Sequence, residues 1–272
     1  MSIVYHRGYH RLNNNDITKP IENTLEAFVE AYNNGAKLVE CDIRLSKDNE
    51  IIIWHDETVN SYTSNRKKGA KLLSELELSK IKRIKLINKS QIITLNELIF
   101  FIYNRNIKLV LDVKTELTGI VLANYLNKNK HFIKKIELII SFSQNTLYHF
   151  YNNISVHDIN SCWIVSSHFY TEDVKAEGEV VFSTDDKFLN NYLKYNLLFQ
   201  ENNVGLYLQY NTNITIDYIT KLISIMKLCK FKEIILGIWN DIELFPNYDN
   251  KYHINNMLQL FDYVNVDKPI NN

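Results

Sequence analysis

Short apolar runs of β-forming residues alternate with stretches of helical periodicity along nearly the whole chain, and few folds accept that pattern. The helical periodicity is clearest in Leu25–Tyr32, Leu95–Tyr103, Ile120–Leu126 and Ile216–Leu228. Strands separated by helices in this way favour an α/β fold, a parallel sheet closed into a (β/α)8 TIM barrel, over an open doubly wound sheet. The eight β-like runs are Ile3–His6, Leu38–Ile43, Lys108–Lys114, Leu138–Phe142, Cys162–Ser166, Val204–Gln209, Ile234–Trp239 and Tyr263–Asp267.

Length and charge fit one such domain. The chain has 272 residues, close to the roughly 250 of a typical barrel, so we expect residues 1–272 to form a single domain. Lys and Arg number 31, as do Asp and Glu, and zero net charge argues against broad capture of nucleic acid or an anionic membrane. Without a spanning apolar run or a secretory signal, we expect a cytoplasmic protein with no stable membrane insertion.

A ninth β-like run, Ile51–His55, breaks the alternation. The segment before it is too short for a helical crossover, so we predict a β-hairpin excursion after the second strand. Asp48 and Asn49 are its expected turn residues because both tolerate positive φ. Pairing about that turn places Asp42 opposite His55, which would set an imidazole beside a carboxylate at the mouth of the barrel.

The first helix carries a signal at each end. Asn23, followed three residues later by Glu26, is typical of an N-cap and its partner. Gly35 favours the left-handed residue that stops a helix. We therefore expect a helix bracketed by Asn23 and Gly35.

Two carboxylates share one strand face in Glu40-Cys41-Asp42, because residues two apart point the same way. Such a pair can be an exposed polar face, but its apolar flanks indicate a half-buried strand. Buried like charges favour a compensating cation, and a hard divalent ion suits oxygen ligands. Asp112 and Lys114 repeat the spacing with opposite charges. They form either a structural ion pair or a third metal ligand beside a cation for a phosphoryl oxygen.

Histidines end two of the β-like runs. His6-Arg7-Gly8 combines a group that titrates near neutral pH with a guanidinium that can grip phosphate and a glycine that lets the chain turn. His6 and His55, each near carboxylates, make general acid–base chemistry plausible. The six other histidines, including His10, His131 and His157, are predicted at the surface. The cysteines, Cys41, Cys162 and Cys229, are too scattered for a disulfide framework or zinc cluster and are predicted to be small buried hydrophobic residues.

Together these motifs resemble the glycerophosphodiester phosphodiesterase family, whose fold is a (β/α)8 barrel. The resemblance covers essentially the whole chain in order. It is most specific in the N-terminal third and weak between Tyr151 and Phe231. The matching motifs are His6-Arg7-Gly8, Glu22-Asn23-Thr24, Ala27-Phe28, Gly35-Ala36, Glu40-Cys41-Asp42, Ser46-Lys47-Asp48, His55-Asp56, Thr94-Leu95-Asn96-Glu97-Leu98, Asp112-Val113-Lys114, Ser141-Phe142-Ser143, Trp239 and Asp267-Lys268-Pro269.

The resemblance implies a role for each charged residue of these motifs. Glu40, Asp42 and Asp112 would bind a divalent cation, Ca²⁺ or Mg²⁺. Arg7 and Lys114 would hold the phosphate. Both sets would neutralise the charge of a phosphodiester during its cleavage.

The resemblance also implies the groups that move protons and those that support the site. His6 and His55 would be the general acid–base pair, one activating the nucleophile and the other protonating the leaving alcohol. The nucleophile would be either water or a neighbouring glycerol hydroxyl, which gives a cyclic phosphate. Glu22 would support the His6–Arg7 side of the site, and Trp239 would wall it or belong to the core.

Three positions depart from the family's pattern. The third metal ligand is usually Glu, whereas Asp112 is one methylene shorter. The related sphingomyelinase D group shares the Asp-x-Lys form, but it is secreted, disulfide-bonded and lacks the His-Arg-Gly pattern. The family's Trp-Thr-Val-Asn stretch reads Trp239-Asn240-Asp241-Ile242, and the loop Tyr9–Pro20 is longer than usual. The contacts to the leaving group should therefore differ.

The implied function is metal-dependent hydrolysis of glycerophosphodiesters to glycerol 3-phosphate and an alcohol. A lysophospholipase D-like activity on lipid-bearing diesters, as in the sphingomyelinase D group, is the enzyme alternative, and an exposed apolar rim would favour it. An inactive barrel that serves as a binding module is the alternative of another class. A nucleic-acid-binding module ranks last, because no basic cluster extends beyond Arg66-Lys67-Lys68. The sequence does not identify the alcohol or the oligomeric state.

Overall fold

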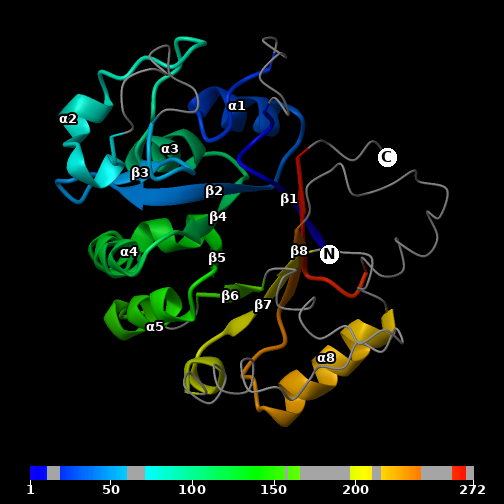
Figure 1. Ribbon diagram of the computed structural model, residues 1–272. Helices are drawn as coiled ribbons and strands as arrows, with labels where there is room; N and C mark the ends of the chain where they lie inside the picture. The colour runs from blue at the N-terminus through cyan, green and yellow to red at the C-terminus, as the bar shows by residue number, and fades with distance from the viewer. Residues whose placement is uncertain are drawn as a thin grey trace, which may run out of the picture.

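Parallel strands close into a barrel in the computed structural model, which describes residues 1–10, 19–59, 71–156, 159–165, 197–209, 216–239 and 259–267 (Figure 1). The order around the barrel is β1-β2-β4-β5-β6-β7-β8-β9, and β9 pairs again with β1. The (β/α)8 TIM prediction is thereby confirmed. The strands are β1 (Ser2–Tyr5), β2 (Leu38–Leu45), β4 (Lys108–Val113), β5 (Ile136–Ser141), β6 (Ser161–Val165), β7 (Val204–Gln209), β8 (Leu236–Trp239) and β9 (Tyr263–Val266).

Helices surround the barrel on its outside (Figure 1). The predicted Ile216–Leu228 has the bounds of α8, whereas the predicted Ile120–Leu126 begins four residues too late, because Thr115 caps α4 by accepting from the Thr118 amide. No helix in the described ranges is long and apolar enough to cross a bilayer. The helices are α1 (Leu25–Asn33), η1 (Leu73–Glu75), α2 (Leu78–Ile81), α3 (Leu95–Ile102), α4 (Glu116–Lys128), η2 (Lys130–Lys135), α5 (Gln144–Asn153) and α8 (Ile216–Leu228).

Strand alternation divides the apolar side chains between two cores. On β2, Val39, Cys41 and Ile43 pack in the layer between the strands and the helices. Glu40 and Asp42 therefore face the barrel interior, as the sequence predicts. Cys41 and Cys162 are buried as expected, while Cys229 is half-buried. The interior core is formed by Val4, Leu38, Val110, Leu138, Ile140, Cys162, Ile164, Tyr207, Ile235 and Tyr263.

The predicted hairpin after the second strand is present, but its register is one residue off. Strand β3 (Ile51–Ile53) pairs antiparallel with β2 such that Ile43 lies opposite Ile53, and the Trp54 amide donates to the Asp42 carbonyl. Asp42 is therefore opposite Trp54, and the prediction that it faces His55 is wrong. The physical reason is a longer turn, closed by a hydrogen bond from the Ser46 amide to the Glu50 carbonyl rather than by two turn residues.

The start of the first helix differs from the prediction, whereas its end agrees with it. Thr24, not Asn23, is the N-cap of α1, so the predicted Asn23 cap is wrong. Asn23 instead has a positive φ of 57° and turns its side chain toward the barrel. The stop at Gly35 is confirmed, because Gly35 has a φ of 83° and follows the last helical turn.

Gly8 lets α1 approach the first strand closely. Its φ is 81°, and a Cβ built there would lie 2.8 Å from the carbonyl carbon and oxygen of Ala27. Gly35 has nearly the same φ, yet nothing lies within 4 Å of the corresponding position. The glycine of the His-Arg-Gly motif is therefore required by space as well as by backbone conformation.

Substituting these two glycines separates the two requirements. Gly35→Ala should lower the free energy of unfolding by about 1 kcal/mol, the strain of a left-handed non-glycine residue. Gly8→Ala should cost about 1–3 kcal/mol more, because the Ala27 backbone must move. Urea unfolding of both variants beside the wild type measures this difference. Equal losses at the two positions would contradict the close-packing argument.

Several sequence predictions fall on residues outside the described ranges. They concern the interior of the Tyr9–Pro20 loop, the basic cluster Arg66–Lys68, His157, the stretch after Trp239, and Lys268-Pro269. His131 is exposed as predicted. His10 is buried, with 7% of its surface exposed, so its prediction as a surface residue is wrong.

Candidate active site

The acidic residues converge because two neighbouring strands hold them in register. Strands β2 and β4 pair in parallel with Asp42 directly beside Asp112, and Glu40 lies two residues earlier on the same face of β2. One ligand oxygen from each of the three carboxylates lies within 4.8 Å of the others. All three residues are at most 5% exposed. The structure thus assembles the three predicted metal ligands at the carboxyl end of the barrel, where barrel enzymes carry their sites.

Burial and mutual repulsion act differently on the three carboxylates. Burial raises the pKa of Glu40 well above its ordinary value, and the charges of Asp42 and Asp112 raise it further. Burial also raises the pKa of Asp112, with partial compensation from Lys114. Burial opposes ionisation of Asp42 as well, but Arg7 and Lys114 outweigh it and hold the pKa of Asp42 below its ordinary value. The cluster therefore lacks enough positive charge within the protein to ionise every member readily.

This imbalance fits a divalent cation. Oδ1 of Asp112 is buried and has no hydrogen-bond partner among the described residues, which is costly unless some group supplies positive charge. Three converging carboxylates form the all-oxygen donor set that Ca²⁺ and Mg²⁺ prefer. The residues present therefore fit the implied metal, although the donor set does not distinguish between these two ions.

Two cations lie against the acidic cluster. Lys114 Nζ is 2.5 Å from Asp42 Oδ1 and also contacts Asp112 Oδ2. Burial alone would lower the pKa of Lys114, but the two aspartates raise it above its ordinary value, so the ammonium is charged at neutral pH. Arg7 Nη1 donates to both carboxylate oxygens of Glu22 at 3.0 and 3.1 Å, and Arg7 Nε lies 3.0 Å from Asp42 Oδ2. Glu22 therefore holds the Arg7 side chain in place, and its supporting role in the reaction stays a prediction.

A strained turn fixes the Arg7 guanidinium. Arg7 has a φ of 52°, in the left-handed region that such a side chain rarely occupies, and Asn23 has a φ of 57°, which Asn tolerates. The Asn23 amide donates to the Arg7 carbonyl at 3.1 Å, and its side chain donates to Asp42 Oδ2 at 2.7 Å. Arg7 also donates its own amide to Glu40 at 3.0 Å. These bonds stabilise the strained backbone of Arg7 at the site, and such strain is common at functional sites.

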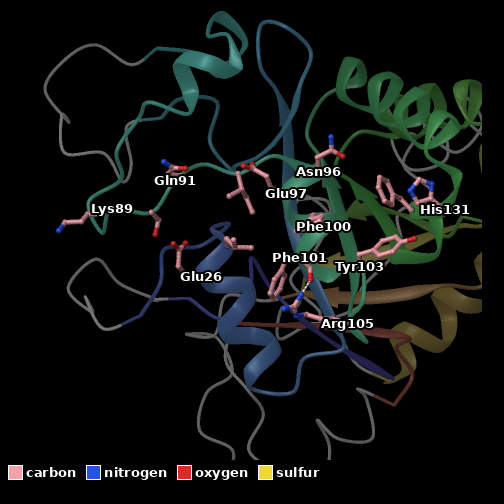
Figure 2. A pocket seen from close by; sticks show the side chains of 14 residues that line it. Glu26, Lys89, Gln91, Asn96, Glu97, Phe100, Phe101, Tyr103, Arg105 and His131 are labelled. Carbon is pink, nitrogen blue, oxygen red and sulfur yellow. Dashed lines mark hydrogen bonds between the residues drawn. The ribbon is translucent and has the colours of Figure 1, made fainter.

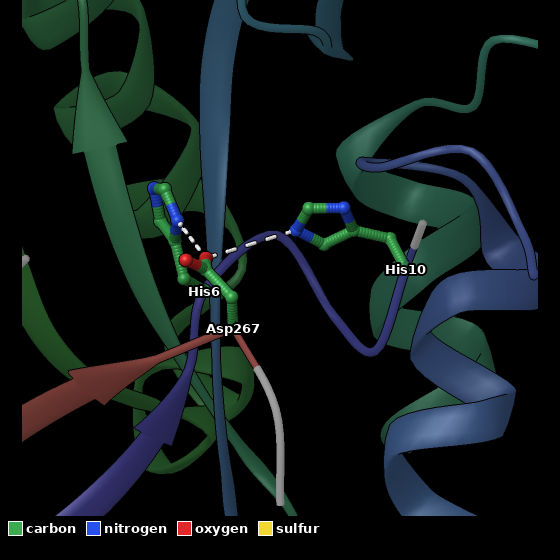
Figure 3. A group of neighbouring side chains, drawn as sticks. All are labelled: His6, His10 and Asp267. Carbon is green, nitrogen blue, oxygen red and sulfur yellow. Dashed lines mark hydrogen bonds and ion pairs between the residues drawn. The ribbon is translucent and has the colours of Figure 1, made fainter. Parts of the chain in front are cut away.

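His6 is oriented by the opposite end of the chain. It follows β1, and its Nδ1 lies 2.7 Å from Oδ1 of Asp267, which follows the neighbouring strand β9 (Figure 3). With Nδ1 hydrogen-bonded there, Nε2 faces the acidic cluster, 3.9 Å from Glu40 Oε2. Burial would raise the pKa of Asp267, but the neighbouring imidazoles of His10 and His6 hold it below the ordinary value. Asp267 is therefore an anion that holds one nitrogen of His6.

His55 has a similar but more exposed setting. Its Nδ1 lies 2.8 Å from Oδ1 of Asp56, and both side chains are roughly 40% exposed. The Arg44 guanidinium donates to the His55 carbonyl at 2.7 Å and so fixes the backbone after β3. Despite the shifted hairpin register, His55 still reaches the site, since it lines the same small cavity as His6.

The small cavity at the barrel mouth has a polar side and an apolar side. Its volume is about 100 Å³. Trp239 and Phe142 meet edge-to-face on the apolar side with ring centroids 6.1 Å apart, and Trp239 Nε1 is buried with no hydrogen-bond partner among the described residues. The lining residues are His6, Arg7, Glu40, His55, Asp112, Lys114, Ile140, Phe142, Ile164, Tyr207, Trp239 and Asn265.

A larger groove of about 1120 Å³ lies on the outside of the barrel, over α1 and α3 (Figure 2). Phe100, which is 85% exposed, and Phe101 belong to its apolar lining. The Arg105 guanidinium lies over the Phe101 ring, 4.2 Å from its centroid. This groove contains none of the predicted catalytic residues, so its size is no guide to the reaction.

Comparison with known proteins identifies the family. The model of the glycerophosphoryl diester phosphodiesterase family matches residues 6–156, which is more than half of the chain. This chain belongs to that family. A glycerophosphodiester phosphodiesterase from Caldanaerobacter subterraneus subsp. tengcongensis is 29% identical over 164 residues, and the alignment spans 58% of this chain and 60% of that relative.

Solved structures of the glycerophosphodiester phosphodiesterase family share the fold. The enzyme from Thermotoga maritima is 21% identical with a TM-score of 0.64, covering 97% of this chain and 93% of that one. A phosphodiesterase from Oleispira antarctica, solved in complex with the product sn-glycerol-3-phosphate, is 20% identical with a TM-score of 0.65. It covers 99% of this chain and 94% of that one. At these identities the likeness shows the barrel alone.

Sequence reasoning missed three residues that lie at or beside the candidate site. The sequence predicts Asn23 as a helix cap, yet its side chain binds Asp42. It predicts His10 at the surface, yet His10 lies 3.9 Å from Asp267. Asp267 belongs to a matching motif that assigns it no role. Of these three residues, only Asp267 has a usable signal in the sequence. It lies at the end of the last β-like run, and closure of the barrel places that run beside the first one.

Proposed function

We propose that this protein hydrolyses glycerophosphodiesters to glycerol 3-phosphate and an alcohol with the help of a divalent cation. The observation that carries the proposal is the convergence of three carboxylates, two cations and two histidines at one barrel mouth. Family membership, a curated relative named glycerophosphodiester phosphodiesterase and a structural neighbour holding sn-glycerol-3-phosphate support the same substrate class.

Positive charge around the phosphodiester is the main contribution of the site. Glu40, Asp42 and Asp112 would hold Ca²⁺ or Mg²⁺, and the bound ion supplies charge stabilisation to phosphoryl oxygens. Lys114 and Arg7 line the same cavity and would hold the phosphate from the other sides. Because Arg7 is already paired with Glu22 and Asp42, its position is set before substrate arrives, which reduces the reorganisation needed during reaction.

The two histidines would move the protons. One accepts a proton from the nucleophile, which is water or a neighbouring glycerol hydroxyl, while the other donates a proton to the leaving alcohol oxygen. Nδ1 of His6 contacts the Asp267 carboxylate and Nδ1 of His55 contacts the Asp56 carboxylate, which leaves both Nε2 atoms for the substrate. With water as nucleophile, the P–O bond to the alcohol breaks as the new P–O bond forms. With the glycerol hydroxyl, a cyclic phosphate forms first and water opens it.

The decisive experiment is a panel of diesters with the purified protein. Glycerophosphocholine and glycerophosphoethanolamine, each with Ca²⁺ or Mg²⁺, should release glycerol 3-phosphate, detected by a coupled dehydrogenase assay. Mass spectrometry of early time points distinguishes a cyclic phosphate from direct hydrolysis. A folded wild type that turns over no diester would contradict the proposal and favour the inactive binding barrel.

A lipid-bearing diester is a second candidate substrate, and the described rim of the mouth favours it. Phe142 is 50% exposed beside Lys114 and Trp239, where an alkyl chain or choline group could pack. If the lipid chain lies there, Phe142→Ser should lower kcat/KM for lysophosphatidylcholine about tenfold more than for glycerophosphocholine. Equal losses on both substrates would exclude a lipid contact at Phe142.

Asp267→Asn tests the orientation of His6. The amide keeps the shape but can donate to Nδ1, which favours the wrong tautomer, so kcat for glycerophosphocholine should fall about 100-fold with little change in KM. The ¹⁵N chemical shifts of the His6 ring report the tautomer directly. Unchanged shifts with unchanged kcat would exclude this positioning role, and a thermal melt close to that of the wild type shows that folding is intact.

A further inference from the structure

A second group of potential metal ligands lies beside the acidic cluster. His6, His10 and Asp267 each turn a ligand atom toward the same small volume, and Figure 3 shows both imidazoles directed at the Asp267 carboxylate. His6 Nδ1 lies 2.7 Å and His10 Nε2 lies 3.9 Å from Oδ1 of Asp267. One ligand atom from each of the three residues lies within 4.8 Å of the others. Among the described residues, this group and the three carboxylates are the two sets with such spacing.

The spacing is close to that of a tetrahedral ion. Zn²⁺ bonds to imidazole nitrogen and carboxylate oxygen are about 2.0–2.2 Å long, which places neighbouring ligand atoms about 3.3–3.6 Å apart. The separations of 2.7 and 3.9 Å bracket that value, so movements of roughly half an ångström would accommodate an ion. Histidine and aspartate rotamers supply such movements without a change in the backbone.

The three residues come from elements that hold them in place. His6 follows β1 and Asp267 follows β9, two strands that pair in parallel, so their backbones are neighbours. His10 ends a tight turn in which the Tyr9 amide donates to the Ala27 carbonyl of α1 at 2.9 Å. His10 and Asp267 are each 7% exposed. The group is therefore a built, largely buried set of donors rather than a chance meeting of surface side chains.

The chemistry of this donor set differs from that of the acidic cluster. Two imidazoles and one carboxylate suit a borderline-soft ion such as Zn²⁺, whereas three carboxylates suit Ca²⁺ or Mg²⁺. We propose that His6, His10 and Asp267 form a Zn²⁺ site whose occupation inhibits the protein. This regulatory role rests on the proposed function, because it assigns a consequence to sequestering His6. The binding itself does not depend on that function.

Inhibition follows from the atoms involved. An imidazole coordinated through Nδ1 carries its proton on Nε2, and that nitrogen then neither accepts a proton nor releases one near neutral pH. Zinc would also replace the hydrogen bond between His6 and Asp267 that orients the ring toward Glu40. A bound ion at this place would therefore remove one of the two proposed acid–base groups without touching the three carboxylates.

Zinc affinity and stoichiometry of the full chain test the site directly. Competition with a chromophoric chelator, in excess Mg²⁺ to occupy the carboxylate cluster, should show one tight Zn²⁺ per chain. His10→Gln should weaken that affinity at least about tenfold. His149→Gln is the matched control, because His149 lies near Glu116 on the outside of the barrel and should leave zinc affinity unchanged.

Kinetics complete the test, each variant being compared with its own zinc-free rate. Zinc should inhibit the wild type and His149→Gln at the concentration that fills the site, and His10→Gln should need at least about tenfold more. Identical zinc affinity in wild type and His10→Gln overturns the site. Tight binding that depends on His10 but leaves turnover unchanged supports the site and overturns its inhibitory role. A protein that is inactive on every diester would contradict the proposed function but not the zinc site, because zinc affinity is measured without turnover.

Discussion

Removing the metal or a carboxylate that would hold it is expected to abolish turnover. EDTA should stop release of glycerol 3-phosphate from glycerophosphocholine, and excess Ca²⁺ or Mg²⁺ should restore it. Glu40→Gln should lower kcat/KM about 10³-fold, because the ion's charge stabilisation of the phosphoryl group is worth several kcal/mol. Arg7 and Lys114, the cations that favour ionisation of Glu40, also interact with Asp42, so neither offsets the charge of Glu40 alone.

Calorimetry with Ca²⁺ or Mg²⁺ distinguishes a lost ligand from a damaged fold. Glu40→Gln should bind the ion weakly while retaining a cooperative thermal transition. Glu137→Gln is the matched control, because that strand carboxylate pairs with Lys108 away from the site and should leave metal affinity and turnover unchanged. Full activity in EDTA would contradict the metal assignment of Glu40, Asp42 and Asp112. The ion that restores the faster rate would also decide between Ca²⁺ and Mg²⁺.

The second large effect concerns the histidines. His6→Ala and His55→Ala should each lower kcat about 10²- to 10⁴-fold on glycerophosphocholine, the usual contribution of a positioned acid or base. His131→Ala, an exposed histidine beside Tyr103 on the barrel exterior, is the control and should keep wild-type kinetics. The comparison uses metal-saturated protein, so that a change in ion affinity does not enter the rate.

A substrate with a good leaving group then assigns the two roles. A glycerophosphodiester of p-nitrophenol needs little protonation as it departs, so the variant that lacks the general acid should recover most of its rate on that substrate. The variant that lacks the general base should stay slow on both substrates. If neither substitution lowered the rate on either substrate, the acid–base proposal for His6 and His55 would be wrong.

The strands were predictable because burial on both faces leaves a strong local signature. Each of the eight β-like runs corresponds to a barrel strand, and the i, i+2 spacing placed Glu40 and Asp42 on the inner face. Predicting that Asp42 lies beside Asp112 also requires the order of the strands. The alternation of strands and helices gives that order only if the sheet is assumed to close into a barrel. The resemblance to a family contributed the roles, not the geometry.

What failed depended on turns and on contacts between distant parts of the chain. One extra residue in the turn after β2 shifted the hairpin register and placed Trp54, not His55, opposite Asp42. Asn23 follows the sequence rule for a cap, but its hydrogen bonds to Asp42 override that preference. The contact between His6 and Asp267 spans 261 positions, and no local sequence pattern predicts it.

The pairing of the first strand with the last has a consequence for when the protein can act. Asp267 orients His6 only after β9 has docked beside β1, so the site is completed by the event that closes the ring. A chain that lacks β9 would hold the three carboxylates on β2 and β4 without an oriented His6. If His6 acts as the proposed acid–base group, partly synthesised or partly unfolded chains that lack this strand pairing should therefore be unable to cleave diesters.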